Sequence, residues 1–357
     1  MQSRGDDRGG NHRRTWGIRR LAFAAGAVGV LLAGTVAGPG PASADPPQAT
    51  CRTLFVPAEV ALVGHAAIYG EYCSVPGGAA RPLQILVPGI TYTHVYFDFP
   101  GFGGRYSYVK FANRHGYDTL AIDRLGTGQS TRPLVAATVN AYSNAEALHG
   151  VVQYARGASL GRAYQNVVLT GHSYGTFTSD LESATYHDVD GIIGTGWLQQ
   201  PTVTGLAGVL SVLTPALLYL PFLGQVVDPT YVTTTPGTRG FFYSADNTDP
   251  AVIAADEQRK STASLAEATY LVPENLGGLT QRIGVPTLRV VGSQDRIMCL
   301  GDSCGPANLA ATLPSLFPSG VAFYVQPGAG HDVALEYNNA GGLDAMLSWL
   351  VTRFPQP

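Results

Sequence analysis

The sequence predicts an α/β protein with a mostly parallel central sheet whose two faces are covered by helices. Two observations predict this class. Short apolar runs typical of buried strands alternate with longer segments of helical period along most of the chain. Hydrophobic residues make up 45% of the 357 residues and charged residues only 13%, which suits a large buried core.

The elements follow from the chain in order. Two β segments at 51–60 and 66–75 are separated by a glycine-containing turn and should form an antiparallel hairpin. The strands expected after it are 83–87, 117–122, 167–169, 189–194, 287–291 and 321–325. The expected helices are 105–114, 140–156, 176–187, 308–317 and 342–354.

The alternation stops between residues 197 and 275. Within this stretch, 205–227 is apolar enough to suggest a membrane span, but Pro215 and Pro221 interrupt it. We expect 197–275 to be an inserted helical cap with an apolar underside that faces the site, and ordinary core helices are the alternative. The core would then comprise 45–196 and 276–357.

The N-terminus predicts export. Six arginines precede the apolar run 21–37, and Ala42-Ser43-Ala44 forms a cleavage-type site. This order is typical of a signal peptide over 1–44, with cleavage near Ala44 and secretion. A membrane anchor is the alternative, but the run is short and rich in glycine, so we expect no stable membrane span. The arginine pairs at 13–14 and 19–20 leave open whether the chain uses twin-arginine export or the general secretory route.

Charge and cysteines narrow the function further. Without residues 1–44 the chain has 16 basic and 23 acidic residues, which gives no support to nucleic-acid binding. Four cysteines in an exported chain favour two disulfides, and of the three pairings we expect Cys51–Cys73 and Cys299–Cys304. The alternative, metal binding by Cys299, Asp302 and Cys304, lacks the usual zinc spacings, so no metal site is predicted.

The stretch 166–177 carries the candidate nucleophile. An apolar strand leads into GHSYG, and a helical pattern follows, which is the context of a G-x-S-x-G turn with Ser173 at its apex. Side chains at Gly171 and Gly175 would collide with the adjacent strand and helix. The second match, Gly157 to Gly161, follows the end of a helical pattern and no strand enters it, so Ser159 is expected to be a loop serine.

A serine nucleophile needs a base and a carboxylate that orients the base. Both must come from loops at the carboxyl ends of strands, where Asp295 and His331 lie. We therefore expect Ser173, His331 and Asp295 to act together. Asp332 is a rival acid, and His172 is expected to be structural.

The oxyanion of the tetrahedral intermediate needs two backbone donors. The N–H of Tyr174 is expected to be one, at the start of the helix after the serine. The other should come from the turn after strand 83–87, with Ile90 as the first candidate and Thr91 as the second.

These motifs make the chain resemble the α/β-hydrolase superfamily over nearly all of its mature length except 197–275. The resemblance rests on GHSYG, the Pro88-Gly89-Ile90 turn, DRLGTGQS at 123–130, and the strand-end residues Asp295 and His331. It implies the α/β-hydrolase fold, no cofactor, and Ser173 as nucleophile, His331 as base and Asp295 as orienting acid. Many members have His-Gly where this chain has Pro88-Gly89, which leaves backbone donation intact.

An apolar cap and an export signal together resemble a secreted bacterial esterase or lipase, expected to act as a monomer on a small apolar ester. A secreted serine peptidase is the alternative, since Ser173 to Thr176 also resembles the corresponding turn of actinobacterial aminopeptidases. In that case carboxylates of the cap would hold a free amino terminus, although a solvated polar face is the simpler interpretation of Asp246, Asp249, Asp256 and Glu257. A catalytically silent binding relative is the third hypothesis.

Overall fold

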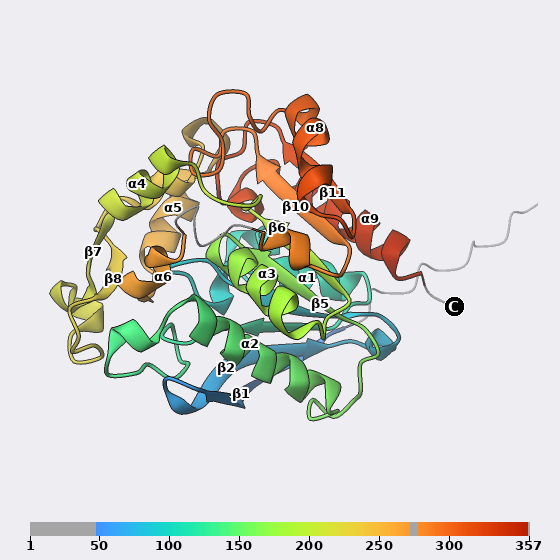
Figure 1. Cartoon of the computed structure of the whole chain (residues 1–357), viewed down its shortest axis with the longest axis horizontal. Helices are drawn as coiled ribbons and strands as arrows, with labels where there is room; N and C mark the ends of the chain where they lie inside the picture. The colour runs from blue at the N-terminus through green and yellow to red at the C-terminus, as the bar shows by residue number, and fades with distance from the viewer. Residues whose placement is uncertain (1–47, 272–277, 356–357) are drawn as a thin grey trace, which may run out of the picture. The chain divides into compact units, whose positions relative to one another are not determined.

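The central sheet has eight strands, and most of them run parallel (Figure 1). The computed structural model describes residues 48–271 and 278–355, so the predicted signal peptide lies outside the described residues. The strand order is β1-β2-β4-β3-β5-β6-β10-β11. The bounds are β1 Thr50–Val60, β2 Gly64–Ser74, β3 Leu83–Val87, β4 Thr119–Ile122, β5 Val167–His172, β6 Gly191–Thr195, β10 Thr287–Gly292 and β11 Val321–Gln326. The predicted α/β-hydrolase fold class is confirmed.

The strands β1 and β2 form the expected antiparallel hairpin at one edge of the sheet, and β2 pairs antiparallel with β4. Cys51 and Cys73 lie opposite each other in the hairpin register and form a disulfide. A second disulfide joins Cys299 to Cys304 in the segment after β10. Both predicted pairings are confirmed, and the pairing of Cys299 and Cys304 rules out their use as metal ligands.

Helices cover both faces of the sheet (Figure 1). α1 (Tyr108–Arg114) contacts α9 (Asn339–Arg353), while α2 (Ala141–Arg156) packs against α3 (Tyr174–Tyr186). α8 (Pro306–Leu316) packs beside β11. α2 begins after Asn140 because the Asn140 side chain accepts hydrogen bonds from the first turn.

The starts of α1 and α9 differ most from the prediction, by three residues each. α1 begins at Tyr108 rather than at 105, because the side chain of Ser107 caps it. α9 begins at Asn339, ahead of the expected 342, with Gly341 and Gly342 inside the helix. A Cβ on Gly341 would lie 2.3 Å from the hydroxyl oxygen of Tyr324, so the glycine lets the helix pack closely on β11.

The insertion (residues 197–275) is not purely helical. It contains α4 (Val203–Ser211), α5 (Pro250–Glu257) and α6 (Leu265–Thr269), together with a three-stranded antiparallel sheet of β7 (Leu213–Pro215), β8 (Tyr231–Thr234) and β9 (Ala263–Ser264). The helical part of the apolar run 205–227 ends at Ser211. Beyond it, Pro215 lies in a strand and Pro221 in a 3₁₀ turn. Among the described residues no helix is long and apolar enough to cross a membrane.

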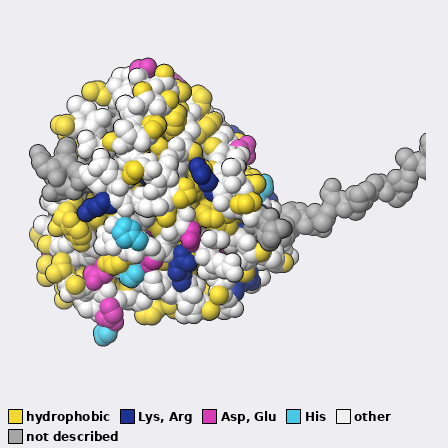
Figure 2. Space-filling model, turned by 45° about the vertical axis from the view of Figure 1, so that its right-hand side comes forward, with side chains coloured by type: hydrophobic (Ala, Val, Ile, Leu, Met, Phe, Trp, Pro, Cys, Tyr) yellow, Lys and Arg dark blue, Asp and Glu magenta, His cyan; other side chains and the backbone are white. Residues whose placement is uncertain are grey.

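The surface reflects the low charge of the sequence. Figure 2 shows one face on which charged side chains are few among hydrophobic and uncharged groups. In the insertion, Leu218, Leu220 and Leu223 in and just after the two 3₁₀ turns are exposed as well.

Candidate active site

Ser173 lies on the tight turn between β5 and α3, in a backbone conformation (φ 52°, ψ −122°) that residues other than glycine rarely adopt. A Cβ on Gly175 would lie 2.0 Å from a carbonyl oxygen of β3, and one on Gly171 would lie 2.4 Å from the backbone of α3. The turn therefore requires both glycines, as the sequence predicts. Ser159 is exposed in the turn after α2.

Ser173, His331 and Asp295 lie together at the carboxyl edge of the sheet. The Nε2 atom of His331 is 2.7 Å from the Oγ atom of Ser173, and its Nδ1 atom is 2.8 Å from the Oδ2 atom of Asp295. The Oδ1 atom of Asp295 accepts from the backbone N–H groups of Ile297 and Met298, which fixes the carboxylate. A neutral His331 thus donates through Nδ1 to Asp295 and accepts from the serine hydroxyl through Nε2.

The surroundings of His331 change its proton affinity. Burial lowers the pKa of His331, but the charge and hydrogen bond of Asp295 outweigh burial, so the pKa lies above its usual value of 6.5. Asp332 and Glu336 add to the rise. The neutral imidazole, whose Nε2 atom can accept a hydrogen bond from Ser173, therefore predominates only at pH values above this raised pKa.

Two backbone N–H groups point to an oxyanion site. Within the described part of the chain, the N–H groups of Ile90 and Tyr174 have no hydrogen-bond partner, and both residues line the same pocket as Ser173. Gly89 brings the Ile90 turn against the serine, because a Cβ there would lie 3.1 Å from the serine Cβ. Thr91 does not line this pocket, and its carbonyl and hydroxyl oxygens accept bonds from the insertion.

A buried arginine supports the same turn. The Nε and Nη2 atoms of Arg124 donate to the carbonyl oxygens of Pro88 (2.9 Å) and Gly89 (3.2 Å). Its Nη1 atom pairs with Glu267 on α6, and both side chains are almost fully buried. The pairing of Arg124 with Glu267 could not be found from the sequence, because nothing in the local pattern around either residue indicates its partner.

A second buried network lies behind Ser173. His172 Nε2 is 2.9 Å from Asp332 Oδ1, and the Tyr92 hydroxyl contacts both Asp332 and Asp256. Arg239 donates to both oxygens of Asp256 at 2.8 and 2.9 Å. Asp332 therefore binds His172 and not His331, and Asp256 is buried rather than on a solvated face as expected.

Burial and hydrogen bonding together set the protonation states of His172 and Asp332 in this network. Burial lowers the pKa of His172, which keeps its imidazole neutral at neutral pH. Burial alone would raise the pKa of Asp332, but the hydrogen bond from His172 holds it below its usual value. The arrangement gives His172 the structural position that the sequence predicts, beside the serine but turned toward Asp332.

The pocket above Ser173 is apolar. It contains about 380 Å³ of empty space, open solvent included, and no charged residue lines it. The insertion lines most of it with Trp197, Pro201, Leu206, Val209, Ala268 and Leu271, and the core adds Ile90 and Ile297. None of Asp246, Asp249, Asp256 and Glu257 lines this pocket.

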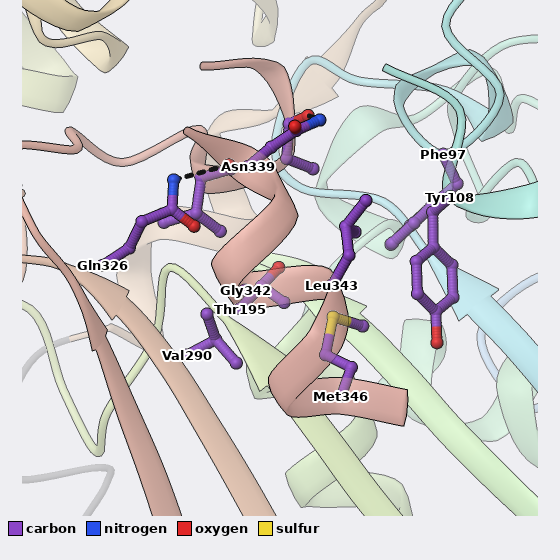
Figure 3. A pocket seen from close by; sticks show the side chains of 11 residues that line it. Phe97, Tyr108, Thr195, Val290, Gln326, Asn339, Gly342, Leu343 and Met346 are labelled. Atoms are coloured by element: carbon purple, nitrogen blue, oxygen red, sulfur yellow. Dashed lines mark hydrogen bonds between the residues drawn. The ribbon is translucent and has the colours of Figure 1, made fainter. Parts of the chain in front are cut away.

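A further, very small cavity of about 10 Å³ lies between α9 and the sheet (Figure 3). Figure 3 shows Leu343 and Met346 of α9 near Tyr108 and Val290, with Gln326 at one side. Gln326 donates through Nε2 to a backbone carbonyl 3.0 Å away. Ser173 does not line this cavity, and its apolar walls mark it as a gap in core packing.

Comparison with known families agrees with this fold. The model of the alpha/beta hydrolase family matches residues 84–341, so the chain belongs to the alpha/beta hydrolase family. Family membership marks it as a hydrolase, for which a small-molecule substrate is expected. No curated protein matches the sequence.

Solved structures share the fold at low sequence identity. A lipase in its open form is 15% identical with a TM-score of 0.58, and the match covers 85% of this chain and 100% of the lipase. The esterase Pf2001 of Pyrococcus furiosus is 12% identical with a TM-score of 0.51, and the match covers 85% and 90% of the two chains. An E-2-(acetamidomethylene)succinate hydrolase is 18% identical with a TM-score of 0.52, and the match covers 84% and 99%.

Proposed function

We propose that the chain is a secreted serine hydrolase that cleaves carboxylic esters of apolar substrates through an acyl-enzyme on Ser173. The observation that carries the proposal is the hydrogen-bond chain from Ser173 through His331 to Asp295 beside an uncharged pocket. Two disulfides and the predicted signal peptide support export.

The geometry supports a two-step mechanism. As the Oγ atom of Ser173 attacks the ester carbonyl, Nε2 of His331 takes the hydroxyl proton, and the Asp295 carboxylate stabilises the imidazolium through Nδ1–H. The N–H groups of Ile90 and Tyr174 donate to the oxyanion. His331 then protonates the departing alcohol, and a water molecule that His331 deprotonates releases the acid from Ser173.

We assign the insertion the role of a cap over this site. Leu206, Val209, Ala268 and Leu271 from the insertion line the pocket of Ser173 and suit an apolar acyl or alkyl group. An aminopeptidase would need a carboxylate near this pocket for the substrate ammonium group, and the described lining has none. The pocket thus favours an ester over a peptide with a free amino terminus.

The test compares p-nitrophenyl esters from acetate to laurate with aminoacyl p-nitroanilides, measured as kcat/KM on the exported protein. We expect ester cleavage, with kcat/KM rising along the acyl series until the pocket is filled. Ser173→Ala should remove it, and Ser159→Ala, the matched control in the other G-x-S-x-G sequence, should retain it. Faster turnover of the anilides would contradict the ester assignment.

A further inference from the structure

Three side chains that can bind a metal ion meet away from the site of Ser173. His149 lies on α2, Glu182 lies on α3, and Asp188 lies in the turn before β6. One potential ligand atom from each lies within 4.8 Å of the other two. Because the strands run parallel, the turn before β6 is at the opposite edge of the sheet from Ser173, which follows β5.

Carboxylate oxygens of this cluster are buried without hydrogen-bond partners. The side chain of Glu182 is fully buried, and neither of its carboxylate oxygens has a hydrogen-bond partner. The Oδ1 atom of Asp188 is also buried without a hydrogen bond, and the Nδ1 atom of His149 lies 2.9 Å from the other oxygen of Asp188, Oδ2. An unsatisfied buried carboxylate is costly, and a group of such atoms facing one point needs an explanation.

The distances suit ligands around one ion. Nδ1 of His149 is 2.9 Å from Oδ2 of Asp188 and 3.7 Å from Oε1 of Glu182. Ligand atoms at about 2.1 Å from a shared Zn²⁺ lie roughly 3.0–3.4 Å apart in octahedral or tetrahedral geometry. Small side-chain movements would therefore bring all three atoms into coordination.

Neighbouring groups hold the ligands in place. The His149 ring stacks on Tyr186 with centroids 3.9 Å apart and an interplanar angle of 12°. The Nε2 atom of Gln153 donates to Oδ2 of Asp188 at 2.5 Å, a contact of the kind that orients metal-binding carboxylates. The side chain of His149 is 30% exposed and that of Asp188 16%, so an ion has a route from solvent.

We propose that His149, Glu182 and Asp188 form a binding site for a divalent transition-metal ion of the Zn²⁺ type. One imidazole nitrogen and two carboxylate oxygens suit Zn²⁺ better than Ca²⁺ or Mg²⁺, which prefer oxygen alone. The ion would join α2, α3 and the turn before β6, and its charge would offset the buried Glu182. This site is structural and does not depend on the proposed esterase activity.

The other described group with potential metal ligands contains Cys51, Glu71 and Cys73, and its two cysteines are joined in a disulfide.

The test uses Zn²⁺ with the exported protein after chelator treatment and dialysis. Titration calorimetry and elemental analysis should give one Zn²⁺ per chain in the wild type. Glu182→Gln, which preserves shape, and His149→Ala should each weaken binding by about tenfold or more. His65→Ala is the matched control, because His65 also lies beside a carboxylate, Glu59, but on the exposed β1–β2 hairpin.

Thermal unfolding gives a second readout that does not depend on ester turnover. Saturating Zn²⁺ should raise the Tm of the wild type and of His65→Ala but not that of Glu182→Gln, because an ion that binds only the folded state stabilises it. Circular dichroism verifies folding of each variant, and Asp188→Asn replaces any variant that fails to fold. Less than one Zn²⁺ per wild-type chain, or equal affinity in wild type and Glu182→Gln, would overturn the proposal.

Discussion

The ion pair between Arg124 and Glu267 connects the insertion to the turn that carries Ile90. We expect Glu267→Gln to lower both stability and activity. Glutamine has nearly the same shape but removes the charge that faces Arg124, and both side chains are almost completely buried. The guanidinium would then keep its bonds to the carbonyls of Pro88 and Gly89 but lose its counter-charge.

The size of each effect follows from this geometry. Removing one partner of a buried ion pair costs about 3–5 kcal/mol, because it leaves an uncompensated buried charge. In a domain of this size that corresponds to a fall in Tm on the order of 10 °C. Loss of one oxyanion donor lowers kcat by about 10²–10³-fold. A displaced Ile90 turn should still donate a weaker hydrogen bond to the oxyanion, so we expect a smaller fall in kcat, about 10–100-fold.

The assay measures Tm by calorimetry and kcat on a p-nitrophenyl ester well below the Tm. Asp180→Asn is the matched control, because Asp180 on α3 forms an equally buried ion pair with Arg289 on β10, and neither residue contacts the Ile90 turn. Its Tm should fall by a similar amount while kcat stays within about threefold of wild type. Equal kcat in Glu267→Gln and Asp180→Asn would refute the role of Arg124 in positioning the turn.

Three further predictions concern the site and its support. Wild-type kcat/KM should fall as the pH drops through the raised pKa of His331. Asp295→Asn should move this acidic fall of the pH profile to lower pH and reduce kcat by about 10⁴-fold. An unshifted acidic fall in the variant would contradict the effect of Asp295 on the pKa of His331. Gly175→Ala should cost about 3 kcal/mol or more in urea unfolding, because its Cβ would lie 2.0 Å from a carbonyl oxygen of β3, and an unchanged midpoint would contradict that contact. Cys73→Ser, which opens the bond to Cys51 across a separation of 22 residues, should cost about 3 kcal/mol, and a loss below about 1 kcal/mol would contradict the chain-entropy argument.

The buried strands were the most predictable part of the fold. β3, β5 and β10 are short apolar runs bounded by glycine, proline or polar turns, so the local pattern is sufficient. The small sheet of the insertion was not predictable, because β7, β8 and β9 span only three, four and two residues. Their pairing depends on contacts between distant parts of the insertion and leaves no periodic signal.

The candidate site likewise has a part that was predictable from the sequence and a part that was not. Ser173, Asp295 and His331 each follow a strand of the parallel sheet, so chain order and strand-end position were enough to bring them together. The residues that support the Ile90 turn could not be predicted from strand-end position. Arg124 and Glu267 are 143 positions apart in sequence, and a buried charge pair is visible only once both segments are folded.

The nucleophilic role of Ser173 is tested most directly by labelling with a serine-reactive fluorophosphonate, followed by peptide mapping in a mass spectrometer. We predict one adduct per chain, on the peptide that contains Ser173. The adduct should be absent in Ser173→Ala and form much more slowly in His331→Ala, because the base that activates the hydroxyl is missing. No adduct on the wild-type protein, or an adduct on Ser159 instead, would contradict the account and favour a catalytically silent relative.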